Sequence, residues 1–125
     1  MQEHYRPAPS RRSAEEKAAE ARLWAAYLEN RSIENRNALW VFHQGLVVFL
    51  AREFKKKLPR RITYPELRSD GNMGLLFAIE HFKPELGVAF STFAARRIRG
   101  AMYDGLGKLG WMPRNIRVRN SRMAR

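Results

Sequence analysis

The chain has 125 residues, of which 45% are hydrophobic, and it contains no cysteine. One domain with its own core is expected at this length, and disulfides, thiolate catalysis and cysteine-based metal sites are excluded. The 24 Lys and Arg residues outnumber the 12 Asp and Glu residues and leave a formal net charge of +12, which predicts a polyanionic partner, with nucleic acid as the first candidate.

Residues 1–12 contain two prolines and three arginines but little apolar surface, which predicts a flexible basic arm. This stretch lacks the apolar segment of a signal peptide. The longest apolar run, residues 46–51, is far too short to cross a membrane. A cytoplasmic protein without a membrane partner is therefore expected.

Two long helices are predicted in the first half of the chain. Ser13 and Glu16 have the spacing of a capping box, so the first helix is expected over residues 13–30. A second, strongly buried helix is expected over residues 33–57, before Pro59. The expected inward-facing residues are Ala18, Ala21, Leu23, Trp24, Tyr27 and Leu28 in the first helix and Leu39, Phe42, Leu46, Phe49, Leu50 and Phe54 in the second.

A third helix is predicted from a second capping box, Thr63 with Glu66, to about Phe82. Gly71 and Gly74 each cost roughly 1 kcal/mol in a helix interior relative to alanine. Their presence predicts that another helix approaches closely at this point. The inward face is expected to carry Leu67, Leu75, Leu76, Ile79 and Phe82.

A fourth helix is expected to begin near Ser91 or a neighbouring cap. Gly105, Gly107 and Gly110 are expected to interrupt it, and Pro113 to open a further helix rich in arginine. Its expected inward residues are Phe93, Ala94, Ile98, Ala101, Met102 and Leu106. The fold class is therefore predicted to be all-α, a compact bundle of about four helices over residues 13–112, with a basic tail over residues 113–125.

The basic charge is concentrated in the last third of the chain. Residues 90–125 contain nine basic residues and one acid, a net charge of +8. Aromatic residues lie within this stretch, which suits opened or single-stranded nucleic acid better than intact duplex, because exposed bases stack on aromatic rings. These aromatic residues are Phe90, Phe93, Tyr103 and Trp111. Phe90 and Phe93 suit a position in the core about as well as a position that stacks on a base.

Glu66 and Asp70 lie four residues apart, on one face of the third predicted helix. They suit a basic surface on a protein partner, or equally a solvated face near a helix N-terminus. The sequence has no phosphate-binding glycine loop, no metal-ligand pattern and no Ser, His and Asp set at a recognisable spacing. Neither an enzyme nor a cofactor nor a metal is expected, and His43 and His81 are interpreted as ordinary helix residues.

The segments DGNMGLLFAIEHF (residues 70–82), FSTFAARRIRGAMYDGL (residues 90–106) and GWMPR (residues 110–114) resemble region 2 of the sigma-70 superfamily, and within it the alternative sigma factors of the motility and sporulation type. The resemblance covers residues 23–117. It implies a bacterial transcription initiation factor whose partners are core RNA polymerase, promoter DNA with an opened non-template strand, and an anti-sigma factor.

The resemblance also implies roles for individual residues. On the third helix it points to contacts with the clamp helices of the polymerase β′ subunit by Glu66, Ser69, Asp70, Asn72 and Leu76. From the fourth helix onward it points to contacts with the minus-ten element of the promoter by Thr92, Phe93, Arg96, Arg97, Arg99, Tyr103, Trp111, Arg114 and Arg117.

The sequence departs from the family at several of these positions. Ser69 stands where a glutamine is usual, Lys83 and Leu86 replace an Asp and an Arg, and Arg96 with Arg97 replaces the Trp pair of the principal sigma factors. Regions 3 and 4 have no counterpart, so either a fragment or a naturally minimal factor is expected. Two other hypotheses stay open: an orphan sigma-like module that binds an anti-sigma factor or another regulator as a decoy or adaptor, favoured by the changes at residues 69, 83 and 86, and a general nucleic-acid or ribosome binder.

Overall fold

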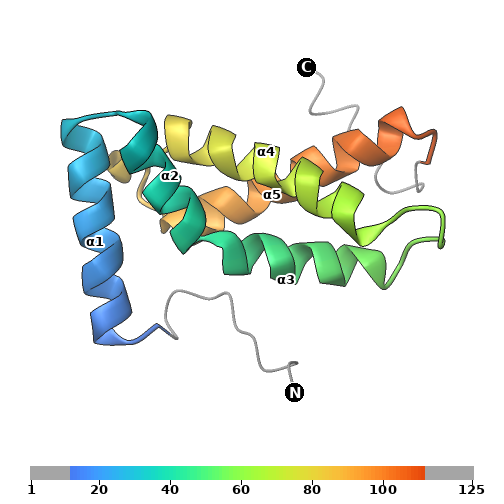
Figure 1. Ribbon diagram of the computed structural model, residues 1–125, viewed down its shortest axis with the longest axis horizontal. Coiled ribbons are helices and arrows are strands. Elements are labelled where there is room, and N and C mark those ends of the chain that lie inside the picture. Colours follow the sequence, from blue (N-terminus) through green and yellow to red (C-terminus); the bar gives the residue numbers. More distant parts are fainter. Residues whose placement is uncertain (1–11, 112–125) are drawn as a thin grey trace.

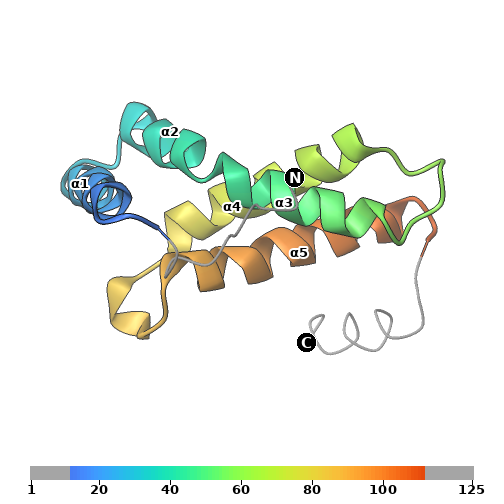
Figure 2. The same cartoon turned by 90° about the horizontal axis from the view of Figure 1, so that it is seen from below.

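The computed structural model describes residues 12–111, which form five α-helices and one short 3₁₀ helix and contain no strand. Three long helices lie alongside one another, and the first helix crosses their end (Figures 1 and 2). The all-α prediction is confirmed. In this part of the chain no helix is long and apolar enough to span a membrane. The elements are α1 (Ala14–Glu29), α2 (Ile33–Phe42), α3 (Gln44–Lys55), α4 (Tyr64–His81), η2 (Pro84–Leu86) and α5 (Phe90–Lys108).

Side-chain caps fix where three of the helices begin. The backbone N–H of Glu16 donates to Ser13 Oγ and that of Ser13 to the Glu16 carboxylate, both at 3.0 Å. Thr63 and Glu66 make the same pair of bonds at the start of α4, at 3.2 and 3.3 Å. Both predicted capping boxes are thereby confirmed. Ser32 caps α2 in addition, because its hydroxyl accepts a hydrogen bond from the backbone N–H of Asn35.

The prediction of one continuous helix over residues 33–57 was wrong at one residue. His43 leaves the helical region with φ −99° and ψ 12°, and it separates α2 from α3. The break lets the two segments pack on different neighbours, α2 against α1 and α4, and α3 against α4 and α5. The apolar periodicity is continuous across the break, so it carried no sign of the change in direction.

His43 is completely buried at this break. Its ring lies 4.7 Å from the ring of Phe90 between centroids, and its Nε2 lies 3.4 Å from a carboxylate oxygen of Glu20 in α1. Burial, and after it the charge of Arg12, lower the pKa of His43 from 6.5 to about 3. The imidazole is therefore neutral at pH 7, and its approach to Glu20 is a polar contact of a neutral ring and not an ion pair.

Arg12 belongs to the folded part of the protein. Its guanidinium lies 3.5 Å from Glu20 and 4.8 Å from the centre of the Phe42 ring. The predicted flexible arm over residues 1–12 therefore does not include its last residue. The other residues of the predicted arm, and those of the predicted tail over residues 113–125, lie outside the described residues.

Stability should fall as the pH falls from 7 to 5, because the unfolded chain protonates His43 near pH 6.5 while the folded chain does not. The stabilisation is present above that pH and decreases by about 2 kcal/mol by pH 5. In the His43→Gln variant, the free energy of unfolding should lack this part of its pH dependence. Urea unfolding of both proteins at pH 7 and pH 5 measures it.

The comparison between the two proteins isolates His43 from its neighbours. Burial raises the pKa of Glu20 and that of Asp70. These two shifts make the folded protein more stable as the pH falls, opposite to the effect of His43, but both carboxyl groups are present in both proteins. Identical pH dependence in the wild type and in His43→Gln would contradict the assignment.

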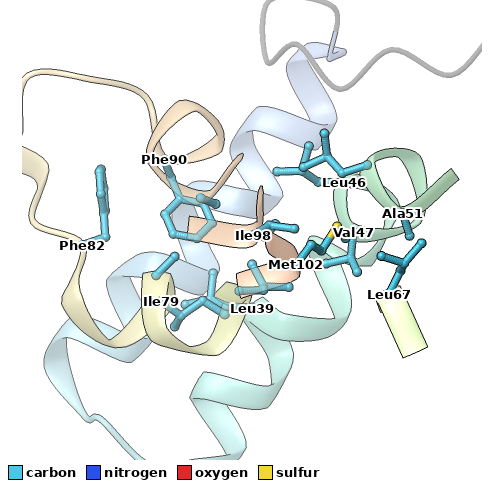
Figure 3. Packing of buried hydrophobic residues seen from close by; sticks show 14 of the residues in the cluster. Leu39, Leu46, Val47, Ala51, Leu67, Ile79, Phe82, Phe90, Ile98 and Met102 are labelled. Atoms are coloured by element: carbon cyan, nitrogen blue, oxygen red, sulfur yellow. The ribbon is translucent and has the colours of Figure 1, made fainter. Parts of the chain in front are cut away.

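The core lies between α3, α4 and α5 and continues under α1 and α2 (Figure 3). Along α5 the buried apolar residues recur at every fourth position, at Phe90, Ala94, Ile98, Met102 and Leu106. Three expected core assignments on α1 were wrong: Leu28 is 43% exposed, and Ala18 and Ala21 are also exposed, because α1 contacts the bundle along a narrow line around Tyr27.

An aromatic cluster joins α1 to the two ends of the loop over residues 83–89. The ring of Trp24 lies 5.5 Å from that of Phe82 and 5.0 Å from that of Phe90, and Phe82 and Phe90 are 5.3 Å apart. Both phenylalanines are buried, whereas every residue between them is exposed. The cluster therefore closes the loop at its base.

The predicted close approach of another helix to Gly71 and Gly74 is confirmed. A Cβ atom added to Gly74 would lie 2.5 Å from the backbone oxygen of Arg97 and 2.8 Å from the Cα of Ile98 in α5. An added Cβ at Gly71 would lie 2.6 Å from the terminal carbon of Met102. These two glycines let α4 and α5 pack with their backbones nearly in contact.

The glycines near the end of α5 do not interrupt it where they were expected to. The helix continues through Gly105 and Gly107 to Lys108, and it starts at Phe90 after Ala89, without a side-chain cap from Ser91. Residue 105 is a glycine inside the helix, and the carboxylate of Asp70 packs against it at the place where a Cβ atom would collide. Chain reversal falls on Gly110, whose φ of +82° favours glycine.

Candidate functional surfaces on α4 and α5

The residues of α4 to which a protein-binding role was assigned fall into two groups. Glu66 and Ser69 are exposed, and Leu76 is half-buried on the same side of the helix, two turns further on. The capping box holds the Glu66 carboxylate while leaving the side chain exposed. Together these three residues form a stripe that a partner can reach.

Asn72 lies at the edge of that stripe and is engaged within the fold. Its side-chain oxygen accepts a hydrogen bond of 2.8 Å from Gln44 at the start of α3. Gln44 in turn accepts one from Arg68, also in α4, at 3.3 Å. This network fixes α4 against α3 directly beneath the stripe. Sequence analysis did not identify Gln44, and a polar residue next to a helix break is only a weak signal for such a role.

Asp70 turns toward α5 on the other side of the stripe. It lines a hollow of about 430 Å³ that also includes Glu66, Ser69, Gly105 and Lys108. Burial raises the pKa of Asp70, while the charge of Lys108 lowers it and that of Glu66 raises it further. Asp70 therefore supports the contact between α4 and α5 and presents only part of its carboxyl group to a partner.

The residues of α5 to which a nucleic-acid role was assigned lie on two faces. Thr92, Arg96, Arg99 and Tyr103 follow one another at spacings of four, three and four residues, which places them along one side of the helix. Thr92 and Arg96 are exposed, and Arg99 and Tyr103 are half-buried. The structure thus brings these four together as a single track, which we call the α5 track.

Phe93 and Arg97 face the opposite edge of the exposed surface, toward α4. The Arg97 guanidinium lies 4.8 Å from the centre of the Phe77 ring and 5.4 Å from that of Phe93. Phe93 is half-buried, and its ring lies 5.5 Å from that of Phe82. A Phe93→Ala variant would therefore change the packing of the domain as well as any binding surface.

Trp111 is held by the turn that ends α5. The backbone N–H of Gly110 donates to the oxygen of Gly107 and that of Trp111 donates to the oxygen of Leu106, both at 3.0 Å, which is a Schellman motif. The Trp111 side chain is half-buried and packs against the core. Arg114 and Arg117 lie outside the described residues.

No group of three or more His, Cys, Asp or Glu side chains in residues 12–111 is arranged to hold a metal ion. Carboxylates lie at the start of α4, and guanidinium groups lie along α5. Since α4 and α5 run antiparallel and pack backbone to backbone, the two sets of charges have a fixed relative position (Figure 1).

Known proteins share this part of the chain. The family model described as Sigma-70 region 2 matches residues 39–112. The chain is 40% identical over 88 residues to "RNA polymerase sigma factor FliA" of Yersinia enterocolitica, a match that covers 70% of this chain and 38% of that protein. It is 38% identical over 90 residues to the protein of the same name from Escherichia coli (strain K12), covering 72% and 37% of the two chains.

A third relative is "RNA polymerase sigma-D factor" of Bacillus subtilis (strain 168), which is 33% identical over 101 residues, or 81% of this chain and 40% of that protein. The chain thus matches well under half the length of each of these curated relatives. Residues 39–112, which the family model matches, include all of α4 and α5.

Proposed function

Because this chain belongs to the Sigma-70 region 2 family, we propose that it binds core RNA polymerase through α4 and holds the opened minus-ten element of a promoter on α5. The observation that carries the proposal is the rigid, antiparallel contact of these two helices at Gly71 and Gly74. A protein that joins polymerase to DNA needs both surfaces on one rigid body. No bond is made or broken by the chain in this role.

Polymerase binding is assigned to the exposed stripe of Glu66, Ser69 and Leu76, with Asn72 and Asp70 at its two edges. The partner expected is the pair of clamp helices of the β′ subunit. The acids suit basic side chains on that partner, and the half-buried Leu76 supplies apolar contact. The hydrogen bonds among Asn72, Gln44 and Arg68 keep the stripe in place before the partner arrives, which reduces the ordering cost of binding.

Binding of the minus-ten element is assigned to the α5 track, together with Phe93, Arg97 and Trp111, and to Arg114 and Arg117 beyond the described residues. Guanidinium groups neutralise phosphates, and a planar side chain receives a base that has left the stack. The interleaving of Arg96 and Arg99 with Thr92 and Tyr103 suits a single strand whose bases are accessible. A duplex offers the same phosphates but hides its bases, so the track is expected to favour opened DNA.

The polymerase contact is tested by the double variant Glu66→Gln, Asp70→Asn. Glutamine preserves the capping box, and asparagine preserves the shape of the residue against Gly105, so both charges are removed with little change to the fold. Wild-type protein should co-elute with bacterial core RNA polymerase, and the double variant should bind about tenfold more weakly. The matched control is Glu15→Gln, Glu29→Gln on α1, which should bind like the wild type.

A second function is favoured by one observation: Ser69 is exposed in the middle of the stripe, where its short hydroxyl offers less contact than the glutamine usual in the family. A module that had lost strong polymerase binding would serve as a decoy or adaptor for an anti-sigma factor or another regulator. Wild-type protein that fails to co-elute with core polymerase would favour this function over the first.

A further inference from the structure

A groove lies between α4 and α5. Its volume is about 380 Å³, and it is lined by Met73, Gly74, Phe77, Arg96, Arg97, Gly100, Ala101 and Asp104. Met73 is 65% exposed and Phe77 is 41% exposed, although both are large apolar side chains. The floor of the groove is formed by residues with no side chain or a small one, which are Gly74, Gly100 and Ala101. It therefore offers apolar surface at a depth that another polypeptide can reach.

The wall formed by α5 is cationic. Arg96 and Arg97 are both exposed there, and within the described part of the chain neither guanidinium takes part in an ion pair. Asp104 lies two turns further along the same helix and is the one acid among the groove residues. An apolar floor beside two unpaired positive charges is complementary to a segment that presents apolar and acidic side chains on adjacent faces.

The Phe77 ring is not available as a platform for a nucleic-acid base. His81 stacks on the ring at 3.9 Å between centroids and an interplanar angle of 17°. The guanidinium of Arg97 lies 4.8 Å from the centre of the same ring. A base would have to displace one of them, whereas an aliphatic side chain can pack between Met73 and the edge of the ring without displacing either.

We infer that this groove binds an acidic amphipathic helix of a partner protein, with aliphatic side chains against Met73 and Phe77 and carboxylates on Arg96 and Arg97. Binding of a helix through apolar residues at spacings of three and four is an established mode of recognition. A helix in this position covers Arg96, which also belongs to the α5 track. Occupation of the groove therefore competes with DNA, a consequence that rests on the proposed function, whereas the docking itself does not.

The test uses a fluorescein-labelled helical peptide with leucines at spacings of three and four residues and glutamates on the flanking face. Binding to the full chain is measured by fluorescence anisotropy. Met73→Glu places a negative charge on the floor and should weaken binding about tenfold or more. The matched control is Ile33→Glu, since Ile33 is 64% exposed at the start of α2 and does not line the groove, and this variant should bind like the wild type.

A peptide in which every glutamate is replaced by glutamine should also bind more weakly, because it cannot pair with the two arginines. Equal binding by both peptides, or equal binding by Met73→Glu and Ile33→Glu, would overturn the proposal. A single-stranded oligonucleotide serves as the second probe. If Met73→Ala weakened binding of the oligonucleotide as much as that of the peptide, the groove would be assigned to nucleic acid instead.

The unlabelled peptide should displace the oligonucleotide from wild-type protein. Peptide binding without displacement would overturn the claimed competition and leave the docking site in place. Co-elution of the wild-type protein with core polymerase is measured separately, without the peptide. Failure of the groove proposal and failure of the proposed function therefore give different results.

Discussion

Replacing Gly74 with alanine should destabilise the protein by about 3 kcal/mol, although alanine is the better helix former by about 1 kcal/mol. The added methyl group would lie 2.5 Å from the backbone oxygen of Arg97 and 2.8 Å from the Cα of Ile98. Backbone atoms cannot rotate away as a flexible side chain can, so α4 and α5 would have to separate. Chemical denaturation at pH 7, followed by circular dichroism, measures the change.

Gly45→Ala is the matched control for this effect. Gly45 is an exposed residue in the first turn of α3 and has no positive φ, so alanine there should stabilise the protein by up to about 1 kcal/mol. Equal effects of the two substitutions would show that α4 and α5 are not in backbone contact. The Gly74→Ala variant should also bind polymerase and DNA more weakly if the two surfaces need a fixed relative position.

The double variant Arg96→Ala, Arg99→Ala should bind single-stranded DNA about 100-fold more weakly than the wild type. Each arginine in the α5 track is expected to contribute on the order of 1 to 2 kcal/mol. The dependence of log K on log salt concentration should become shallower by about 1.4, since each phosphate contact to a single strand contributes about 0.7. Fluorescence anisotropy with single-stranded and duplex forms of one AT-rich oligonucleotide, over a range of salt concentrations, measures both quantities.

Lys17→Ala, Arg22→Ala is the charge-matched control, because both residues are exposed on α1 at the end of the bundle. Loss of two positive charges from this remote site should reduce binding far less. A similar loss from both double variants would indicate that total charge, and not the α5 track, attracts DNA. A similar loss for single-stranded and duplex forms would count against trapping of opened bases.

The chain positions of most helices could be predicted because local signals mark them. Ser13 with Glu16 and Thr63 with Glu66 identify two helix starts to within a residue, and Gly71 with Gly74 indicated the contact with α5. The break at His43 could not be predicted, since its contact with Glu20 of α1 is distant in sequence and the apolar periodicity continues unchanged across the break. Gly105 was misinterpreted for a similar reason: its partner, Asp70, is distant in sequence.

The resemblance to the sigma-70 region 2 family, read from motifs in α4 and α5, is confirmed by the family match. It identified candidate residues but not which of them share a face. The charge distribution indicated only that the last third of the chain is basic, whereas the structure separates the α5 track from Phe93 and Arg97. The groove at Met73 and Phe77 was not predicted, because the sequence does not show which apolar side chains off the inward face border a hollow beside α5.

The aromatic closure of Phe82, Phe90 and Trp24 makes the loop over residues 83–89 energetically independent of the core. Its ends are held together by buried rings, and its own side chains are all exposed, so substitutions within it have little effect on folding, except at Gly87, whose φ of +78° favours glycine. Natural variation can accumulate there without a loss of stability that selection would remove. Lys83 and Leu86, which depart from the family pattern, are therefore positions where selection can act through binding alone. Related proteins can diverge in their partners at this loop while they keep one fold.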